Sequence, residues 1–341
     1  MQYITQIGTS FKRNGGAERI FRMFSSHKIF TGDIQFRQSI CVNPESYDKE
    51  FCDSFSHPVY LGTYEDVRKA IKNDDIILFW TDHKLNESNL PKPKIGLLWA
   101  CWEEPRIIQN NNEYITHCVA ISKKIVNVMC KDKPTKIIYP NVDYEKLQLY
   151  HTKEDFKRKH NFKESDFIIG MIARIGENKR HIWLMNALKK IKNKNIKAVF
   201  VGEGNLKKRL ESLNVPNCHF VGHHEKVGDW YNIFDAFCVL SPNEGGPLTM
   251  FESFYMNVPF IHTPVGLTEE FCNCTNSFMV KNTEQLIDVI KFLYEMKPEN
   301  RKLYTMNNKE ITEKYSNHDT IAKNWYDFLK NISQENKRRL L

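Results

Sequence analysis

Short apolar runs alternate with helical or polar segments along the chain, and this alternation limits the possible folds more than any other sequence feature. In the first 145 residues the apolar runs cover residues 3–7, 36–42, 58–61, 76–80, 95–99, 116–121 and 136–139. Residues 17–24, 64–72 and 123–130 have the spacing of amphipathic helices. Strands that alternate with helices form a parallel sheet covered on both faces. We therefore expect an α/β domain over residues 1–145.

The same alternation returns in the second half. Strands are expected at residues 167–173, 198–201, 219–222, 236–240 and 258–261, and helices at 181–192, 227–234, 267–271, 283–294, 301–315 and 320–332. Residues 146–166 between the halves are polar and dense in charge, which predicts a linker with a helix. We expect a second α/β domain over residues 167–315, followed over 316–341 by a C-terminal helix and a frayed basic tail.

Residues 237–266 combine a strand, a glycine-rich loop, a helix and a further strand. Gly245 and Gly246 allow the backbone to pass close to a ligand, and Pro247 suits the first turn of a helix. A helix that begins at residues 247–249 points unpaired N–H groups and its positive dipole end into the loop. This predicts a phosphate-binding site.

Two carboxylates frame this helix start. Glu244 lies in the loop, and Glu252, eight positions later, falls inside the helix after about one turn. Carboxylates accept hydrogen bonds from hydroxyl groups, so both side chains could reach one ligand. The combination suits a sugar attached to a diphosphate.

The sequence SPNEGGPLTMFESFYMNVPFI, with Glu244 and Glu252 separated by seven residues, resembles the signature of retaining glycosyltransferases of family 4, the glycosyl transferases group 1. The resemblance implies the GT-B fold, in which two Rossmann-like domains face each other across a cleft and the C-terminal helix crosses back to the N-terminal, acceptor-side domain. It also implies transfer of a hexose from a nucleotide-diphosphate sugar to a hydroxyl of a glycan, lipid or protein, without a metal or other cofactor.

Arg174 and Lys179 lie five positions apart between an expected strand and an expected helix. A guanidinium and an ammonium at this spacing can converge on one diphosphate, although two solvated cations of a basic chain would look the same. The resemblance assigns them to the leaving diphosphate and assigns Glu244 to the hydroxyls of the donor sugar. These three are the predicted catalytic residues.

The resemblance assigns further residues to the donor. Glu252 is expected at the ribose, Gly222 and His223 at the nucleobase, and the loop glycines Gly15 and Gly16 near the phosphates. The predicted loop and helix start comprise Gly245, Gly246, Pro247 and Leu248. Residues 202–204 read G-x-G, but they do not form a dinucleotide fingerprint because Lys207 stands where the third glycine would be.

Two loops after strands of the first domain supply the acceptor-side candidates. The first contains His83, and the second contains Trp102 and Glu103. Indole rings stack on sugar faces, but a tryptophan at the end of a strand can also belong to the core. The second loop has no histidine, which departs from the loops of many family members.

Composition restricts the remaining possibilities. The net charge of +8 on 341 residues is mild, and it leaves room for contact with anionic lipid but forms no nucleic-acid-binding stripe. Nine cysteines without a C-x-x-C pair predict neither a disulfide framework nor a zinc site. With no signal segment and no run of eighteen apolar residues, we expect a cytoplasmic protein whose membrane contact is at most peripheral.

Three other classes of protein stay open at this point. A paired-carboxylate glycosidase would leave Arg174 and Lys179 without a role. A non-catalytic nucleotide-sugar-binding or scaffold protein could use the same fold. A nucleic-acid-binding protein has the net charge in its favour. The sequence does not identify the nucleotide, the sugar or the acceptor.

Overall fold

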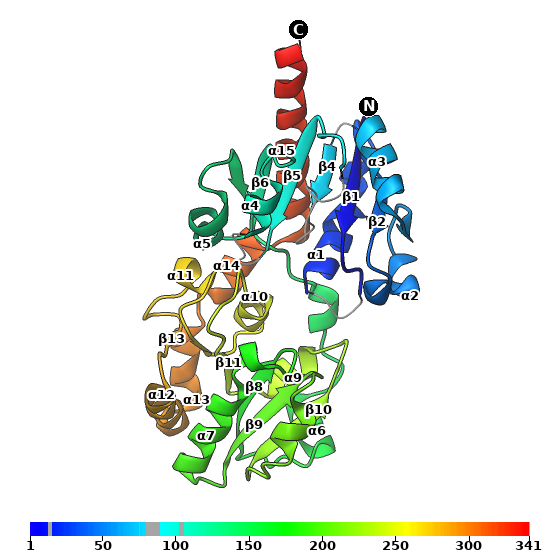
Figure 1. Cartoon of the computed structure of the whole chain (residues 1–341). Coiled ribbons are helices and arrows are strands. Elements are labelled where there is room, and N and C mark those ends of the chain that lie inside the picture. The colour runs from blue at the N-terminus through cyan, green and yellow to red at the C-terminus, as the bar shows by residue number, and fades with distance from the viewer. Residues whose placement is uncertain (13–15, 75, 80–88, 102–105, 341) are drawn as a thin grey trace. The chain divides into compact units, whose positions relative to one another are not determined.

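The computed structural model describes residues 1–12, 16–74, 76–79, 89–101 and 106–340. The chain forms two compact units (Figure 1). The first contains Met1–Asn141 and Tyr315–Leu341, and the second contains Val142–Lys314. Both units are α/β, as the alternation of apolar runs and helices predicts. Within the described residues, no helix is both long enough and apolar enough to span a lipid bilayer.

The first unit is built on a sheet in which all described strands are parallel. Their order is β3 (Val59–Leu61), β2 (Ile34–Cys41), β1 (Gln2–Gly8), β4 (Ile76–Phe79), β5 (Ile95–Ala100), β6 (His117–Ala120) and β7 (Thr135–Ile137). Every residue of β4 and β5 is buried, as expected for central strands covered on both faces.

Helices of the first unit connect these strands and cover the sheet. Those described are α1 (Gly16–Ser25), η1 (Lys28–Phe30), η2 (Pro44–Ser46), α2 (Lys49–Cys52), α3 (Tyr64–Asn73), α4 (Arg106–Asn111), α5 (Lys123–Ile125), η4 (Val126–Cys130) and α15 (His318–Leu340). The helix predicted at residues 123–130 is present, but its second part has the wider π-helical turn.

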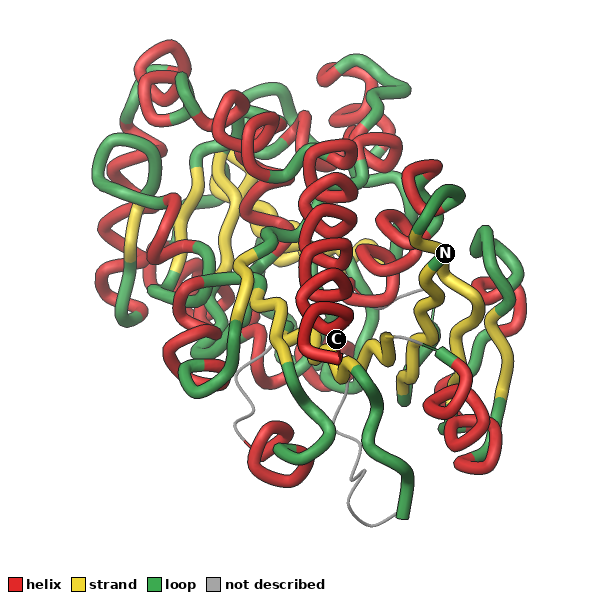
Figure 2. The backbone as a smooth tube through the Cα atoms, turned by 90° about the horizontal axis from the view of Figure 1, so that it is seen from above, coloured by secondary structure: helices red, strands yellow, loops and turns green. Residues whose placement is uncertain are grey.

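The C-terminal helix α15 belongs to the first unit, as the resemblance implied, and Figure 2 shows it as one uninterrupted helix. The Trp325 ring stacks on Phe24 of α1 with 4.4 Å between centroids, and it meets Trp99 of β5 edge-on at 6.0 Å. All three side chains are buried. The basic tail was predicted to fray, but α15 continues to Leu340, because its Gln, Glu, Lys and Arg residues favour a helix.

The second unit contains another parallel sheet. Its described strands follow the order β10 (Cys218–Gly222), β9 (Ile196–Val201), β8 (Phe167–Ile172), β11 (Ala236–Val239), β12 (Phe260–His262) and β13 (Phe278–Met279). The two-residue strand β13 was not predicted, since it is too short to leave a pattern. The sequence order turns at β8 and β11, where loops of a parallel sheet bind ligands.

The helices of the second unit are shorter than predicted over residues 301–315. Those described are η5 (Tyr144–Leu147), α6 (Lys153–Lys159), η6 (Glu177–Lys179), α7 (His181–Ile191), α8 (Lys207–Glu211), α9 (Gly228–Ile233), α10 (Leu248–Tyr255), α11 (Thr268–Phe271), α12 (Thr283–Glu295), α13 (Pro298–Arg301), η7 (Lys302–Tyr304) and α14 (Asn308–Tyr315). The single helix predicted over residues 301–315 is thus divided between α13, η7 and α14.

Residues 146–166 are not a free linker, because they pack within the second unit. Phe156 is buried against Trp230 of α9, with 4.9 Å between ring centroids. The carboxylate of Asp229 accepts hydrogen bonds from the backbone N–H groups of Tyr150 and His151 at 2.9 and 3.1 Å. These apolar and capping contacts could not be predicted from the sequence, because the segment is dense in charged residues. The chain passes between the units just before it, at Asn141–Val142.

Candidate functional site

The loop between β8 and α7 carries the two predicted cations. β8 is buried almost throughout, and Arg174 follows it as an exposed side chain. Lys179 ends the short helix η6 and is half-buried. The Asn178 side chain donates a hydrogen bond to the backbone oxygen of Asn243 at 3.1 Å. This loop is therefore tied to the glycine-rich loop that follows β11.

The loop between β11 and α10 holds Glu244 in place. The Ser241 hydroxyl donates to Glu244 Oε1 at 2.7 Å, and the Thr263 hydroxyl donates to the Ser241 backbone oxygen at 2.5 Å. α10 begins at Leu248 as predicted, with Pro247 as its N-cap and no side-chain cap. The Met250 N–H donates to the Pro247 oxygen at 3.0 Å, and the N–H groups before it receive no cap from Pro247, so an anion fits this place.

Gly266 fixes the path of the same loop. Its φ of +45° lies in the left-handed region, and a Cβ atom there would come within 2.3 Å of the Gly245 oxygen and 2.5 Å of the Glu244 oxygen. A glycine is required at this position because any side chain would displace the loop. Gly245 is buried and Gly246 is half-buried.

Lys179 and Glu244 form an ion pair between their Nζ and Oε1 atoms. The two side chains are 28% and 15% exposed, so the pair is partly shielded and still reaches the surface. The structure thus unites two of the three predicted catalytic residues at the start of α10. Arg174 lies on the same loop as Lys179 but forms no ion pair with the described residues.

Glu252 lies one turn inside α10, as its spacing predicts, but its carboxylate does not share an open site with Glu244. Its side chain is 1% exposed. The Tyr231 hydroxyl of α9 donates to Oε2 at 2.8 Å, and Lys146 of η5 pairs with Oε1. The two carboxylates thus have different partners, because α10 turns Glu252 toward α9 and η5. That both reach one ligand stays a prediction.

The predicted nucleobase residues lie where β9 and β10 end. Gly222 has a φ of +81°, and its oxygen accepts a hydrogen bond from the Gly202 N–H at 2.7 Å. His223 follows it as an exposed residue. A Cβ atom on Gly204 would come within 2.2 Å of the Ile175 oxygen. The G-x-G turn is thus packed against the loop that carries Arg174.

Three residues of this region were not singled out in the sequence: Lys146, Tyr231 and His181. His181 is the first residue of α7 and is 1% exposed. Burial, with a smaller contribution from Lys179, lowers its pKa to about 4, so it is neutral. The sequence signal that could have identified His181 is its place directly after Lys179 and Arg180. Lys146 and Tyr231 offered none, because their contacts with Glu252 depend on the tertiary fold.

The first unit contributes fewer described candidates. Gly16 begins α1 and is exposed. Gly15, His83, Trp102 and Glu103 lie outside the described residues. Glu18, in the first turn of α1, accepts a hydrogen bond from the Ser10 hydroxyl at 2.6 Å, and burial raises its pKa. A buried carboxyl group at the start of a helix after the first strand was also missed in the sequence.

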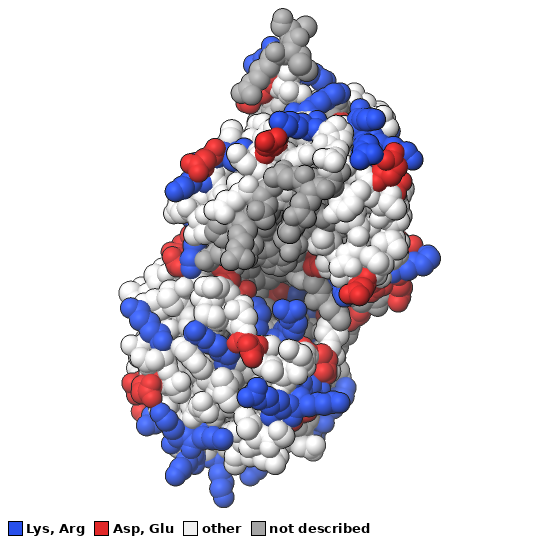
Figure 3. All heavy atoms as spheres, viewed as in Figure 1, with Lys and Arg blue, Asp and Glu red and all other residues white. Residues whose placement is uncertain are grey.

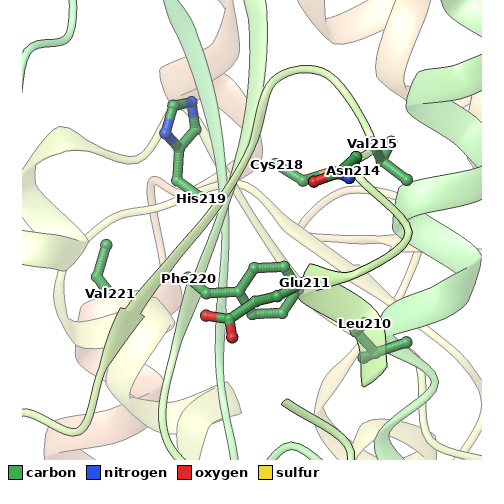
Figure 4. Close-up of a pocket in the computed structure, with 8 residues that line it drawn as sticks. All are labelled: Leu210, Glu211, Asn214, Val215, Cys218, His219, Phe220 and Val221. Atoms are coloured by element: carbon green, nitrogen blue, oxygen red, sulfur yellow. The ribbon is translucent and has the colours of Figure 1, made fainter. Parts of the chain in front are cut away.

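A separate hollow lies beside the edge strand β10, and it includes neither Glu244 nor Lys179. Figure 4 shows His219 and Phe220 on opposite sides of this strand. Phe220 packs on Phe200, with 4.8 Å between centroids, and His219 packs on Phe162 at 5.0 Å. These are contacts of the domain core, so the hollow is a surface groove outside the candidate site.

Part of this chain is similar in sequence to known proteins. Residues 152–310 match the family model described as glycosyl transferases group 1. The chain is 29% identical over 151 residues to the uncharacterized glycosyltransferase MJ1059 of Methanocaldococcus jannaschii, a match that covers 42% of this chain and 37% of that protein. It is 30% identical over 131 residues to the O-antigen biosynthesis glycosyltransferase WbnH of Escherichia coli, with 36% of each chain covered. The matches thus span little more than a third of either relative.

The fold has relatives among solved structures. The Alr3699/HepE protein of Anabaena, in complex with UDP and glucose, superposes with a TM-score of 0.79 over 96% of this chain and 99% of that chain, at 14% identity. A glycosyltransferase of Rickettsia africae gives a TM-score of 0.79 over 97% and 98% of the two chains, at 18% identity. At these identities the likeness concerns the fold.

Proposed function

We propose that this chain, which has the GT-B fold of two Rossmann-like domains, transfers a hexose from a nucleotide-diphosphate sugar to a hydroxyl acceptor. The match of residues 152–310 to the glycosyl transferases group 1 model supports this proposal. The observation that carries the proposal is the placement of Lys179 and Glu244 beside the uncapped start of α10. A cation, a carboxylate and a helix N-terminus together match a diphosphate joined to a polyol.

In the proposed reaction, Arg174 and Lys179 neutralise the charge that develops on the leaving diphosphate, and the start of α10 adds its dipole. Each charge-assisted contact of this kind contributes about 2–4 kcal/mol to transition-state stabilisation. Glu244 accepts hydrogen bonds from the donor-sugar hydroxyls. Lys179 exchanges its bond to Glu244 for one to a phosphate oxygen, which frees the carboxylate for the sugar.

We further propose a retaining, metal-independent transfer. The sequence contains no Asp-x-Asp pair to hold a metal-bound diphosphate, and the two cations can take over that task. In a front-side mechanism, the leaving phosphate oxygen accepts the proton of the attacking hydroxyl, so that no separate base is needed. The reaction should then continue in EDTA, and the product should keep the anomeric configuration of the donor.

The proposed donor and acceptor follow from the relatives. Alr3699/HepE is described in complex with UDP and glucose, which makes a UDP-hexose the first donor to test. WbnH acts in O-antigen biosynthesis, which favours a growing glycan as acceptor. Both assignments are proposals for this chain.

A peripheral contact with anionic lipid is proposed for the basic end of the second unit. Lysine and arginine side chains gather there in Figure 3, at the end where α7 lies. Lys189, Lys190, Lys192 and Lys194 are exposed in and just after α7. Co-sedimentation with anionic vesicles, reversed by about 0.5 M salt, would support this contact.

A binding screen tests the proposed function most directly. The purified chain is titrated with UDP-, GDP- and ADP-sugars in EDTA, and each ligand that binds is tested for slow donor hydrolysis. Binding of one nucleotide family with hydrolysis supports a transferase and identifies its donor. Binding without hydrolysis or transfer would favour a nucleotide-sugar-binding scaffold, and no binding by the folded chain would contradict the proposal.

A further inference from the structure

A polar cavity of the first unit contains none of the residues that the proposed function uses. It has a volume of about 240 Å³ and is bordered by β2, β3 and α3. Two cations, two amides and a tyrosine belong to its lining: Arg37, Lys69, Gln38, Asn73 and Tyr60. The volume lies below the range of about 300–1,000 Å³ that is typical of sites for larger ligands. A small molecule or ion therefore fits it best.

A β-bulge in β2 directs Arg37 toward this cavity. In the pairing of β2 with β1, Phe36 lies opposite Ile4. The next pair joins Gln38 to Thr5, so Arg37 is an extra residue in the register. Successive side chains of a regular strand point to opposite faces of the sheet. The bulge breaks this alternation, and as a result Arg37 and Gln38 both line the cavity.

The guanidinium of Arg37 is held on two sides. Its Nε atom lies 2.7 Å from Oδ1 of Asp74, a buried carboxylate to which the Thr5 hydroxyl also donates. The centroid of the Tyr3 ring lies 3.9 Å from Arg37 Cζ. Within the described residues, the two terminal nitrogens of Arg37 have no hydrogen-bond partner, and the side chain is 42% exposed. Their N–H groups are thus oriented by the protein and available to a ligand.

Neighbouring side chains add further hydrogen-bond donors. The Tyr60 hydroxyl donates to Gln38 Oε1 at 3.3 Å, so the amide nitrogen of Gln38 remains a donor for the cavity. Burial raises the pKa of Tyr60, which keeps this hydroxyl protonated. On α3, Lys69 and Asn73 are both exposed and lie one turn apart on the same face of the helix.

The two carboxylates at the cavity already have partners in the protein. Asp74 is paired with Arg37 and bonded by Thr5. Asp66 accepts hydrogen bonds from the N–H and hydroxyl groups of Thr63 at 2.8 and 2.7 Å, in the capping box of α3. These bonds lower the pKa of Asp66, so it stays ionised and engaged with the helix start. The groups that face a ligand are therefore mainly donors, which suits an oxyanion.

The cavity lies near the amino ends of the strands. Asp74 precedes β4, and Tyr3 is the second residue of β1. Ligands of parallel sheets bind beyond the carboxyl ends of the strands, where the predicted acceptor-side loops begin. The cavity is thus a second site within the first unit and does not belong to those loops.

We propose that this cavity binds the oxyanion group of a small ligand, a phosphate or a carboxylate, between Arg37 and Lys69. Asp74 and Tyr3 position the guanidinium, and Gln38 donates an amide N–H to the anion. A hexose phosphate and a hexuronate each carry such a group. The inference does not depend on the proposed function, because no residue assigned to the donor takes part in it.

Calorimetric titration tests the site with inorganic phosphate, glucose 6-phosphate, glucuronate and glucose as probes. The full chain carries Lys179→Ala, which weakens anion binding at the proposed donor site. At least one anionic probe is expected to bind at millimolar concentration, and glucose is not. Binding of glucose 6-phosphate without glucuronate assigns the site to a phosphate, and the reverse assigns it to a carboxylate. Binding of both supports a site that recognises the charge.

Variants of the lining locate the binding. Lys69→Met should weaken the affinity for the bound probe about tenfold, because it removes a charge-assisted contact. Arg37→Met combined with Asp74→Asn should abolish binding, and it leaves no buried charge without a partner. Arg37→Lys should also bind less tightly, since an ammonium lacks the fork of the guanidinium. The control is Lys72→Met, an exposed change on the same helix at a residue that does not line the cavity.

Three results would overturn the inference. The first is absence of binding of every anionic probe to the folded chain. The second is binding that both Lys69→Met and the Arg37→Met, Asp74→Asn double variant leave at full strength, because the anion would then lie elsewhere. The third is equal affinity for glucose and glucose 6-phosphate, because recognition would not depend on the anionic group.

Discussion

At the scale of single residues, Glu244 and Glu252 show what the spacing of two residues can predict and what it cannot. Their separation predicted correctly that one lies in the loop and the other one turn inside α10. It could not predict the lysine that meets each of them, because Lys146 and Lys179 come from other elements that only the tertiary fold brings near. Positions along one helix follow from its period, whereas partners across elements do not.

The pair of Lys179 and Glu244 gives the first prediction. Glu244→Gln keeps the bond from Ser241 but loses the charge, so turnover should fall on the order of 100-fold while the unfolding free energy changes by less than about 1 kcal/mol. Lys179→Ala should also weaken nucleotide binding. Steady-state kinetics and thermal unfolding measure both effects. Glu284→Gln, in the exposed pair with Lys190, should leave kinetics unchanged, and native turnover in either site variant would remove that residue from the site.

A buried histidine of the first unit gives a prediction about pH. The Ser39 hydroxyl donates to Gln6 Oε1 at 2.9 Å, so its 2.8 Å bond with His57 Nε2 is donated by the imidazole. Within the described residues, His57 Nδ1 has no partner, and protonation would bury a further N–H there. Burial accordingly lowers the His57 pKa from 6.5 to about 4.

Because the folded pKa lies below the unfolded value, the contribution of His57 to stability is complete above about pH 6.5 and is lost as the pH falls toward 4. From pH 8 to pH 5 this loss amounts to about 2 kcal/mol. Urea unfolding of His57→Gln should show a correspondingly shallower pH dependence than the native chain. Equal slopes between pH 7 and 5 would show that His57 is protonated in the folded state. The interval from pH 8 to 7 serves as the internal control.

At the scale of elements, most strands and helices followed from the sequence, because apolar runs and amphipathic periods are local signals. The exceptions have physical causes. β13 is two residues long, residues 301–315 are broken into several short helices, and residues 146–166 conceal buried contacts within a charged segment. The loop and helix at residues 241–255 were predicted well because glycines, proline and helix start must occur in a fixed order there.

The crossing of two loops at Gly266 predicts a specific effect of an added methyl group. Gly266→Ala should destabilise the second unit by about 1–3 kcal/mol and weaken nucleotide binding, because the left-handed backbone is strained and the Cβ atom meets the oxygens of Gly245 and Glu244. Gly32→Ala is the control, since no atom lies within 4 Å of its Cβ position. Chemical denaturation and nucleotide titration provide the measurement. Unchanged binding in a folded Gly266→Ala would show that the loop can shift without harm to the site.

At the scale of the whole molecule, the first unit is assembled from both ends of the chain, whereas the second is continuous. The core of the first unit is completed by Trp325 of α15, which packs against Phe24 and Trp99. At the connection, the Ser316 hydroxyl donates to the Pro140 oxygen at 2.6 Å, so the two segments that leave the first unit are joined there.

The discontinuous core predicts an uneven loss of stability. Trp325→Ala should destabilise the first unit by about 3–5 kcal/mol, which lowers its unfolding temperature by about 10 °C. Differential scanning calorimetry should then show the transition of the second unit unmoved. Asp327→Ala, an exposed change on the same helix, should move neither transition. An equal fall of both transitions in Trp325→Ala would mean that the units unfold together.

Because the first unit is assembled from two separate segments, its core can be completed only after the second unit has been synthesised. The sheet strands of this unit precede the second unit in the chain, yet the helix that covers Phe24 and Trp99 follows it. The second unit, being continuous, can complete its core while the first still waits with apolar side chains uncovered. During synthesis the first unit therefore stays open to chaperones until α15 has followed the whole second unit, and a chain released near residue 316 would contain one finished domain and one unfinished domain.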